Sequence, residues 1–155
     1  MSNELVDLIQ TLEQDHRRLV SEVRDLEQWV TGKKGSTGPT FWSRVVETLD
    51  RIRTIVKSHG ELETAKLFPA LREATREDSD WQLGMTEMQD ELILKEVGRL
   101  CDLVSRTPMG ISLPELKESA THLARWITEH VTIEEKFLFP KISKRATPPR
   151  NTPGG

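Results

Sequence analysis

The same pattern of side chains occurs twice in this chain. In each copy a histidine is followed by a glutamate four residues later and by Leu-Phe-Pro at the eighth to tenth positions. The first copy spans His59–Pro69 and the second spans His130–Pro140. Residues four apart share one face of an α-helix, so each pair can direct an imidazole and a carboxylate at one centre. The repeat predicts two equivalent helices that contribute to one site.

Apolar residues recur at spacings of three and four in four long segments, which predicts four helices. We expect these helices at about 3–32, 39–75, 80–106 and 112–144, with Leu94 and Phe137 among their apolar stripes. Pro39 suits a first helical turn, and Ser112 with Glu115 forms a capping box. No run shows the alternation of a strand. The fold class predicted is all-α, an antiparallel up-down-up-down four-helix bundle with a pseudo-two-fold repeat of helical hairpins.

Composition limits the domain organisation, the classes of partner and the cellular compartment expected for this chain. Residues 1–145 are expected to form one domain, and residues 146–155, rich in Pro, Gly and Thr, a disordered tail. The net charge is −3 with both signs interleaved, so no basic stripe suggests nucleic acid. No segment approaches the roughly 20 apolar residues of a membrane span, and none reads as a signal peptide. The single cysteine, Cys101, excludes an internal disulfide and indicates the reducing cytoplasm.

Polar residues interrupt the apolar stripes at positions that favour metal binding. Buried charges are normally paired or bound to a cation, and imidazole with carboxylate suits several transition metals. The alternative to a metal-ligand role for Asp90 is that of a solvent-facing residue or of an acceptor for a histidine N–H. Glu87 and Glu91 flank Asp90, and His122 lies well along the axis from His130, so ordinary roles are expected for all three. The candidate ligands are His16, His59, Glu63, Asp90, His130 and Glu134.

In this order the motifs resemble the hemerythrin-like (HHE cation-binding) family. The carriers are Asp15-His16-Arg17-Arg18-Leu19 and the two repeats with their Leu-Phe-Pro ends. The resemblance implies a di-iron centre, oxo- or hydroxo-bridged, with terminal ligands His16, His59 and His130. It implies that Glu63 and Glu134 bridge the irons, with Glu135 the alternative to Glu134. It also implies that Trp126, whose ordinary reading is core packing, lines a dioxygen pocket.

The third helix departs from that family because it has no histidine. Asp90 stands at the expected place, and Glu87 is a possible further carboxylate ligand there. A centre richer in oxygen ligands favours ferric iron, which argues against reversible dioxygen carriage. One iron, zinc or manganese are the alternatives to two irons.

The function expected from the resemblance is binding or reaction with dioxygen, peroxide or nitric oxide, in sensing or protection against oxidative stress. The alternatives are iron storage or delivery for iron–sulfur repair, and a structural or interaction bundle with zinc or no metal. No Ser or Cys lies at a useful spacing from a histidine for nucleophilic catalysis. Whether the chain is an enzyme stays open, and no protein partner is indicated.

Overall fold

The computed structural model describes residues 3–32, 38–74, 81–106 and 110–146. All its regular elements are helical, as predicted, and the part of the chain it describes contains no strand. The expected tail at 146–155 lies, apart from Ala146, outside the described residues. In order the elements are α1 (Asn3–Val30), α2 (Pro39–Leu62), the π-helical turn η1 (Glu63–Leu67), α3 (Phe68–Ala74), α4 (Trp81–Val104), α5 (Leu113–Ile133), the π-helical turn η2 (Glu134–Leu138) and α6 (Phe139–Ala146).

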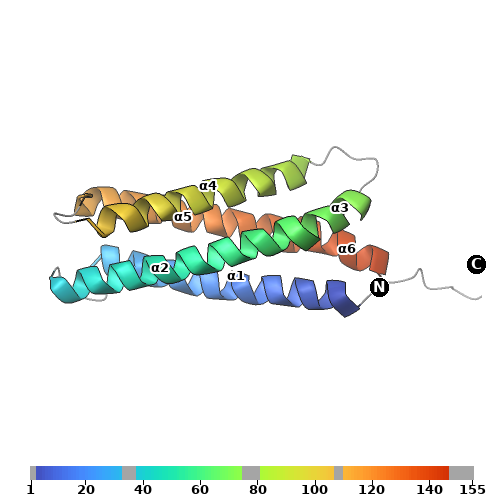
Figure 1. The fold of residues 1–155 in the computed structure, drawn as a ribbon, viewed down its shortest axis with the longest axis horizontal. Coiled ribbons are helices and arrows are strands. Elements are labelled where there is room, and N and C mark those ends of the chain that lie inside the picture. Colours follow the sequence, from blue (N-terminus) through green and yellow to red (C-terminus); the bar gives the residue numbers. More distant parts are fainter. Residues whose placement is uncertain (1–2, 33–37, 75–80, 107–109, 147–155) are drawn as a thin grey trace, which may run out of the picture.

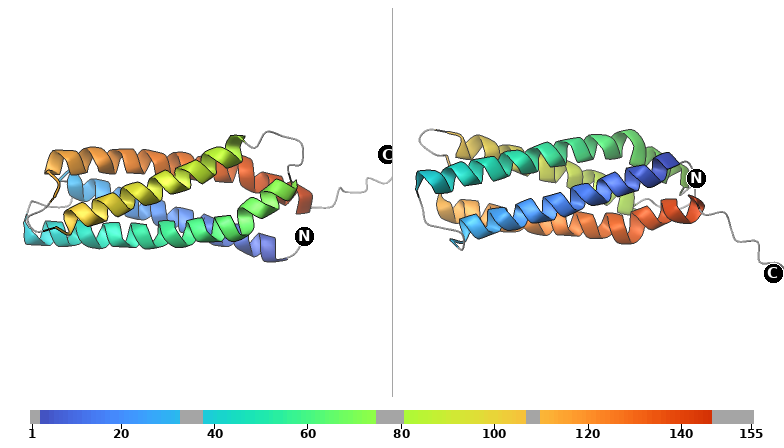
Figure 2. Two further views of the ribbon diagram at one scale, coloured as in Figure 1. Left: turned by 45° about the horizontal axis from the view of Figure 1, so that its top comes forward. Right: turned by 90° about the horizontal axis from the view of Figure 1, so that it is seen from below.

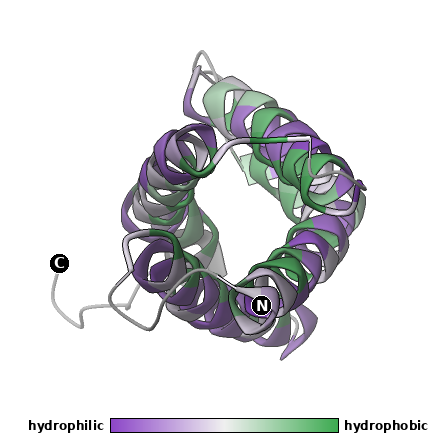
Figure 3. Cartoon of the chain, turned by 90° about the vertical axis from the view of Figure 1, so that its left-hand side faces the viewer, coloured by the Kyte–Doolittle hydropathy of each residue, from purple (hydrophilic) through white to green (hydrophobic). Residues whose placement is uncertain are grey.

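The long helices form a bundle. α1 packs beside α2 and α5, and α4 packs beside the same two helices. Figure 1 shows them lying along a common long axis, with the start of α1 and the end of α6 at the same end of the molecule. Seen along that axis in Figure 3, the helices surround one interior, and much of the hydrophobic colour faces it. None of the described helices is both long and apolar enough to cross a membrane.

Two apolar clusters fill the interior. The larger one contains Leu26, Leu49, Leu100 and Leu123 from the four long helices, and the smaller one contains Leu12, Leu67 and Leu138. Each fully buried leucine contributes about 1.5–3 kcal/mol through removal of its side chain from water. The candidate metal ligands lie between the clusters, since His16 follows Leu12 of the smaller cluster and precedes Leu19 of the larger one.

Each Leu-Phe-Pro motif begins at the last residue of a π-helical turn. The Phe68 N–H donates to the Glu63 carbonyl, and the Phe139 N–H donates to the Glu134 carbonyl, five residues back in each case. A proline lacks the N–H donor and clashes with the carbonyl four residues earlier, so a wider turn before it relieves the conflict. Neither Pro69 nor Pro140 ends its helical segment. Both helices continue as α3 and α6, which leave the lines of α2 and α5 (Figure 2).

The prediction that Leu94 and Phe137 belong to the buried apolar stripes is wrong. Leu94 is 39% exposed and Phe137 is 48% exposed. Leu94 directly follows the buried Ile93. Successive residues of an α-helix are about 100° apart around its axis, so the Leu94 side chain lies at the solvent-facing edge of the apolar stripe. At Phe137 the π-helical turn changes the register, so the next residue, Leu138, is buried instead.

The predicted helix starts at Pro39 and Ser112 are confirmed, because α2 begins at Pro39 and Ser112 caps α5. The Glu115 N–H donates to the Ser112 hydroxyl at 3.3 Å.

We expect Ser112→Ala to lower the free energy of unfolding by about 1 kcal/mol, because a helix N–H loses its acceptor. Urea denaturation followed by circular dichroism measures this, with the exposed Ser43→Ala as control. Equal stability of the two variants would contradict the capping role.

Candidate metal centre

The structure brings the six predicted ligand residues into one layer of the bundle. Each helix of the bundle core contributes, with His16 on α1, His59 on α2, Asp90 on α4 and His130 on α5. The first residues of the two π-helical turns, Glu63 and Glu134, complete the set. Five of the six are fully buried, and the Asp90 side chain is 18% exposed. The layer therefore places charged groups where water does not screen them.

One part of the layer is rich in nitrogen. Glu134 Oε1 lies 2.8 Å from His16 Nε2, 2.8 Å from His130 Nε2 and 3.2 Å from His59 Nε2. The ligand atoms of these four residues all lie within 4.8 Å of one another. Three imidazoles and one carboxylate converging this closely form a set suited to a transition-metal cation.

The other part is rich in oxygen. Its members are Glu63, Asp90 and His130, whose ligand atoms also lie within 4.8 Å of one another. His130 Nε2 is 3.3 Å from Glu63 Oε1 and 3.2 Å from Asp90 Oδ1. Glu63 Oε1 also contacts His59 Nε2 of the nitrogen-rich group. The two groups share His130, so they form one continuous site.

The pKa values of these residues respond to burial and to one another. Burial alone would lower the pKa of His59, but hydrogen bonds to Asp15, Glu134 and Glu63 raise it to about 12. Burial likewise opposes the shift at His130, where the carboxylates of Glu134 and Glu63 raise the pKa well above its ordinary value. Without a cation, protons on the imidazoles therefore compensate the carboxylates.

The carboxylates divide into two kinds. Burial, followed by the charge of Glu134, raises the pKa of Glu63. Burial and the charge of Glu63 raise the pKa of Asp90 to about 8. Burial would also raise the pKa of Glu134, but the charge of His130 and hydrogen bonds from the histidines hold it well below its usual range. Glu134 is thus the carboxylate that the imidazoles neutralise most completely.

Unpartnered atoms show that the layer fits a cation. Glu63 Oε2, Asp90 Oδ2 and Glu134 Oε2 are buried and have no hydrogen-bond partner among the described residues. A buried polar atom without a partner costs about 1–3 kcal/mol, and more when it is charged. Three such carboxylate oxygens beside three imidazoles are donors of the kinds that bind iron, zinc or manganese.

Other residues considered from the sequence lie apart from both groups. Glu135 is 37% exposed, and its Oε1 lies 3.7 Å from His16 Nδ1. Glu87 forms an ion pair with Arg72 of α3. His122 is exposed and stacks on Trp126, with ring centroids 6.4 Å apart. Trp126 packs against the larger apolar cluster, and its place in a dioxygen pocket stays a prediction.

Two further residues touch the candidate ligands, and the sequence alone does not predict either contact. Asp15 Oδ2 lies 3.2 Å from His59 Nδ1, and the Phe139 ring stacks on His16 at a centroid distance of 5.7 Å. For Phe139 the sequence favours core packing, with shielding of the site from water as a secondary role. The available signal for Asp15 was its place immediately before His16, which turns it about 100° toward a neighbouring helix. A single sequence does not show which side chain it meets there.

A groove of about 490 Å³ leads from solvent to one of the candidate ligands. It lies between α1 and α5, and His16 lines it together with Val20, Val131 and Glu135. His16 is thus the candidate ligand nearest to this opening on the surface.

The raised histidine pKa values give a testable consequence. A cation binds neutral imidazole, so His59, with a pKa of about 12, must release its proton when a metal binds. Lower pH supplies competing protons, so we expect the apparent affinity for Zn²⁺ to rise between pH 6 and pH 8. Calorimetry in two buffers of different ionisation enthalpy should show at least one proton released per metal bound. Zinc binding that releases no proton and has the same affinity at pH 6 and pH 8 would contradict this account.

Comparison with known proteins agrees with this geometry. No curated protein and no solved structure matches the chain. The family model of the hemerythrin HHE cation-binding domain matches residues 7–142, which include every candidate ligand. The chain therefore belongs to the hemerythrin HHE cation-binding family.

Proposed function

We propose that this hemerythrin-like chain holds two non-haem iron ions and that the centre binds or reacts with dioxygen, peroxide or nitric oxide. The observation that carries the proposal is the pair of overlapping ligand groups that share His130 within one buried layer. A single cation would leave one group's carboxylates uncompensated. Family membership supports a bound cation but leaves the metal and its number open.

Each ligand has a proposed role that follows from its neighbours. His16, His59 and His130 hold the ions through Nε2, the atom that each directs at a carboxylate. Glu63 and Glu134 link the two metal positions, since each contacts more than one histidine. We favour Glu134 over Glu135 as the second link because Glu134 is buried within the nitrogen-rich group.

Asp90 is proposed to complete the oxygen-rich position, in the place of the histidine that the third helix lacks. Its Oδ1 is 3.2 Å from His130 Nε2, and its second oxygen is buried without a partner among the described residues. The ion pair with Arg72 makes Glu87 the weaker candidate for this position.

The up-down-up-down topology with a pseudo-two-fold axis is part of the same proposal. It is supported by the equivalence of the two halves, in which each histidine–glutamate pair ends an α-helix and opens a π-helical turn. Two hairpins related in this way would present matching ligands to one central site.

Bound iron would supply electron transfer and an open position for a small ligand. The protein's own groups define the surroundings. Glu63, Asp90 and Glu134 place negative charge beside the site, which favours the more oxidised metal. Phe139 and the two apolar clusters exclude water on either side of the layer. These features support sensing or protection against oxidants over reversible dioxygen carriage.

We also propose a cytoplasmic location. The support is Cys101, a buried free thiol whose pKa burial raises to about 11, which makes it a core residue rather than a nucleophile or half of a disulfide.

A second function, iron storage or delivery, has one observation in its favour. The groove between α1 and α5 reaches His16 and offers a path for exchange of the metal with solvent. An iron donor should lose its metal to a competing chelator within minutes, whereas a sensor or peroxide-reactive centre should retain it.

The proposed reactivity is tested on anaerobically iron-loaded protein. Addition of peroxide or nitric oxide should change the visible absorption spectrum at stoichiometric amounts. Repeated consumption of peroxide at constant iron content would identify an enzyme, and a single saturating change would identify a sensor. No spectral response to peroxide, nitric oxide or dioxygen would contradict the proposal.

The link through Glu134 is tested by a matched pair of neutral, isosteric changes. We expect Glu134→Gln to lower iron affinity at least tenfold, because it removes a buried carboxylate that three histidines contact. Glu135→Gln should change the affinity less than threefold, because this residue lies outside both ligand groups. Competition with a chromophoric chelator measures both values. The reverse order would assign the bridging role to Glu135.

A further inference from the structure

The three candidate histidine ligands differ in what holds their second ring nitrogen. His59 Nδ1 lies 3.2 Å from Asp15 Oδ2, a hydrogen-bond distance. His16 Nδ1 is 3.7 Å from Glu135 Oε1, and it makes no hydrogen bond within the described residues. His130 Nδ1 is also buried without such a bond in this part of the chain. Of the three rings, His59 is thus the one fixed through Nδ1 in the described structure.

The chemistry of this contact sets the tautomer of His59. A carboxylate only accepts hydrogen bonds, so Nδ1 carries a proton that the ring donates to Asp15. When a metal displaces the proton on Nε2, the neutral ring keeps the one on Nδ1. A neutral imidazole with its proton on Nδ1 has its lone pair on Nε2. Nε2 is the atom that lies 3.2 Å from Glu134 Oε1 and contacts Glu63. The hydrogen bond therefore turns the metal-binding nitrogen toward the site.

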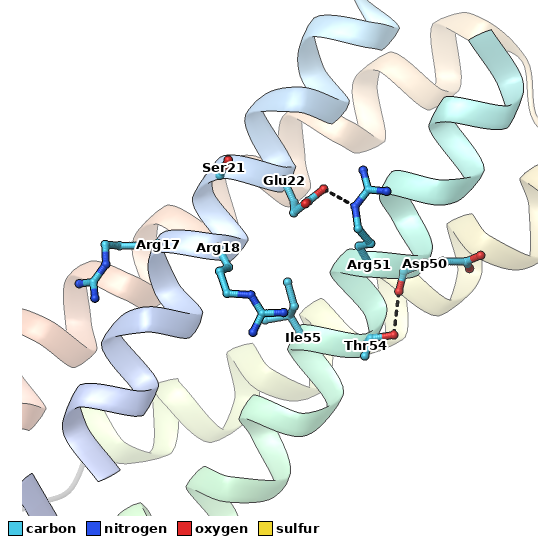
Figure 4. Close-up of a pocket in the computed structure, with 8 residues that line it drawn as sticks. All are labelled: Arg17, Arg18, Ser21, Glu22, Asp50, Arg51, Thr54 and Ile55. Atoms are coloured by element: carbon cyan, nitrogen blue, oxygen red, sulfur yellow. Dashed lines mark hydrogen bonds and ion pairs between the residues drawn. The ribbon is translucent and has the colours of Figure 1, made fainter. Parts of the chain in front are cut away.

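Asp15 is held on its other side by Arg18. Arg18 Nη1 lies 3.7 Å from Asp15 Oδ1, and the Asp15 side chain is only 13% exposed. Arg18 lines a groove of about 470 Å³ between α1 and α2, and Figure 4 shows its guanidinium extending toward Ile55. The carboxylate thus spans from a surface arginine on its own helix to a buried histidine on the next helix.

We propose that Asp15 is a positioning residue for His59, which it fixes in the orientation and tautomer that present Nε2 to the metal. Through Asp15 and His16, α1 contributes twice to the centre, once as a ligand and once by holding the ligand of α2. The inference rests on the proposed metal-binding function. Loss of such an outer partner typically lowers metal affinity 10–100-fold.

The test uses the full chain with Zn²⁺ as a diamagnetic probe. Asp15→Ala is expected to lower Zn²⁺ affinity by about 10–100-fold. Asp15→Asn keeps an acceptor oxygen but no charge, so it should fall between Asp15→Ala and the wild type. The control is Asp7→Ala, which removes an exposed carboxylate from the same helix and should change affinity less than threefold. Chelator competition gives the affinities, and circular dichroism verifies that each variant is folded.

A second readout separates positioning from a general structural role. Long-range ¹H–¹⁵N spectra of the zinc-loaded wild type should show His59 with a single tautomer protonated at Nδ1. In Asp15→Ala that signal should shift or exchange, while the signals of His16 and His130 change little. Wild-type affinity in Asp15→Ala together with an unchanged His59 spectrum would overturn the proposal. If Asp15→Ala fails to fold, the same comparison on the isosteric Asp15→Asn decides it.

Failure of the metal function is distinguishable from failure of this inference. Wild-type protein that binds neither zinc nor iron would refute the proposed function. The hydrogen bond is then read in the metal-free chain, where long-range ¹H–¹⁵N spectra should show a proton on His59 Nδ1 and Asp15→Asn should shift that signal. An unchanged His59 Nδ1 signal would overturn the positioning role.

Discussion

The structure depends on neutralising one layer of buried charge. Three carboxylates and three imidazoles lie together between two apolar clusters, where isolated ions would each cost several kcal/mol. In the metal-free chain the neighbouring carboxylates raise the pKa values of His59 and His130, so protons on these two rings balance part of the negative charge. Glu63, Asp90 and Glu134 still keep one oxygen each without a partner in the described structure. A cation bound by the same residues would satisfy those oxygens and displace the protons.

Helix geometry explains how a continuous apolar bundle accommodates this layer. An α-helical spacing of four places each histidine and its glutamate on one face, and the π-helical turn then begins at the glutamate. That turn changes the helical register and accommodates the following proline, which has no N–H to donate. It also changes the direction of the chain, so that α3 and α6 leave the lines of α2 and α5. The same π-helical turn, present twice, therefore ends the helix face that carries the candidate ligands and begins the smaller apolar cluster.

Much of the fold and of the site was predictable, because helical spacing ties a residue number to a face. Polar residues at positions such as His16 and Asp90 stood out against stripes that are otherwise apolar. The errors arise where that rule changes. Phe137 was misassigned because the π-helical turn departs from the 3.6-residue period, and Leu94 because it lies at the edge of its stripe. The Asp15–His59 contact joins different helices, so it depends on packing that spacing within one helix does not encode.

The central claim is that this layer holds two iron ions, and stoichiometry tests it most directly. The chain would be loaded with Fe²⁺ without oxygen, freed of unbound metal and measured for iron and protein, with Mössbauer spectra to count distinct sites. We expect two irons per chain, one in the nitrogen-rich group and one in the oxygen-rich group. One iron per chain would contradict the role assigned to Asp90. Protein that retains no iron would contradict the di-iron centre itself.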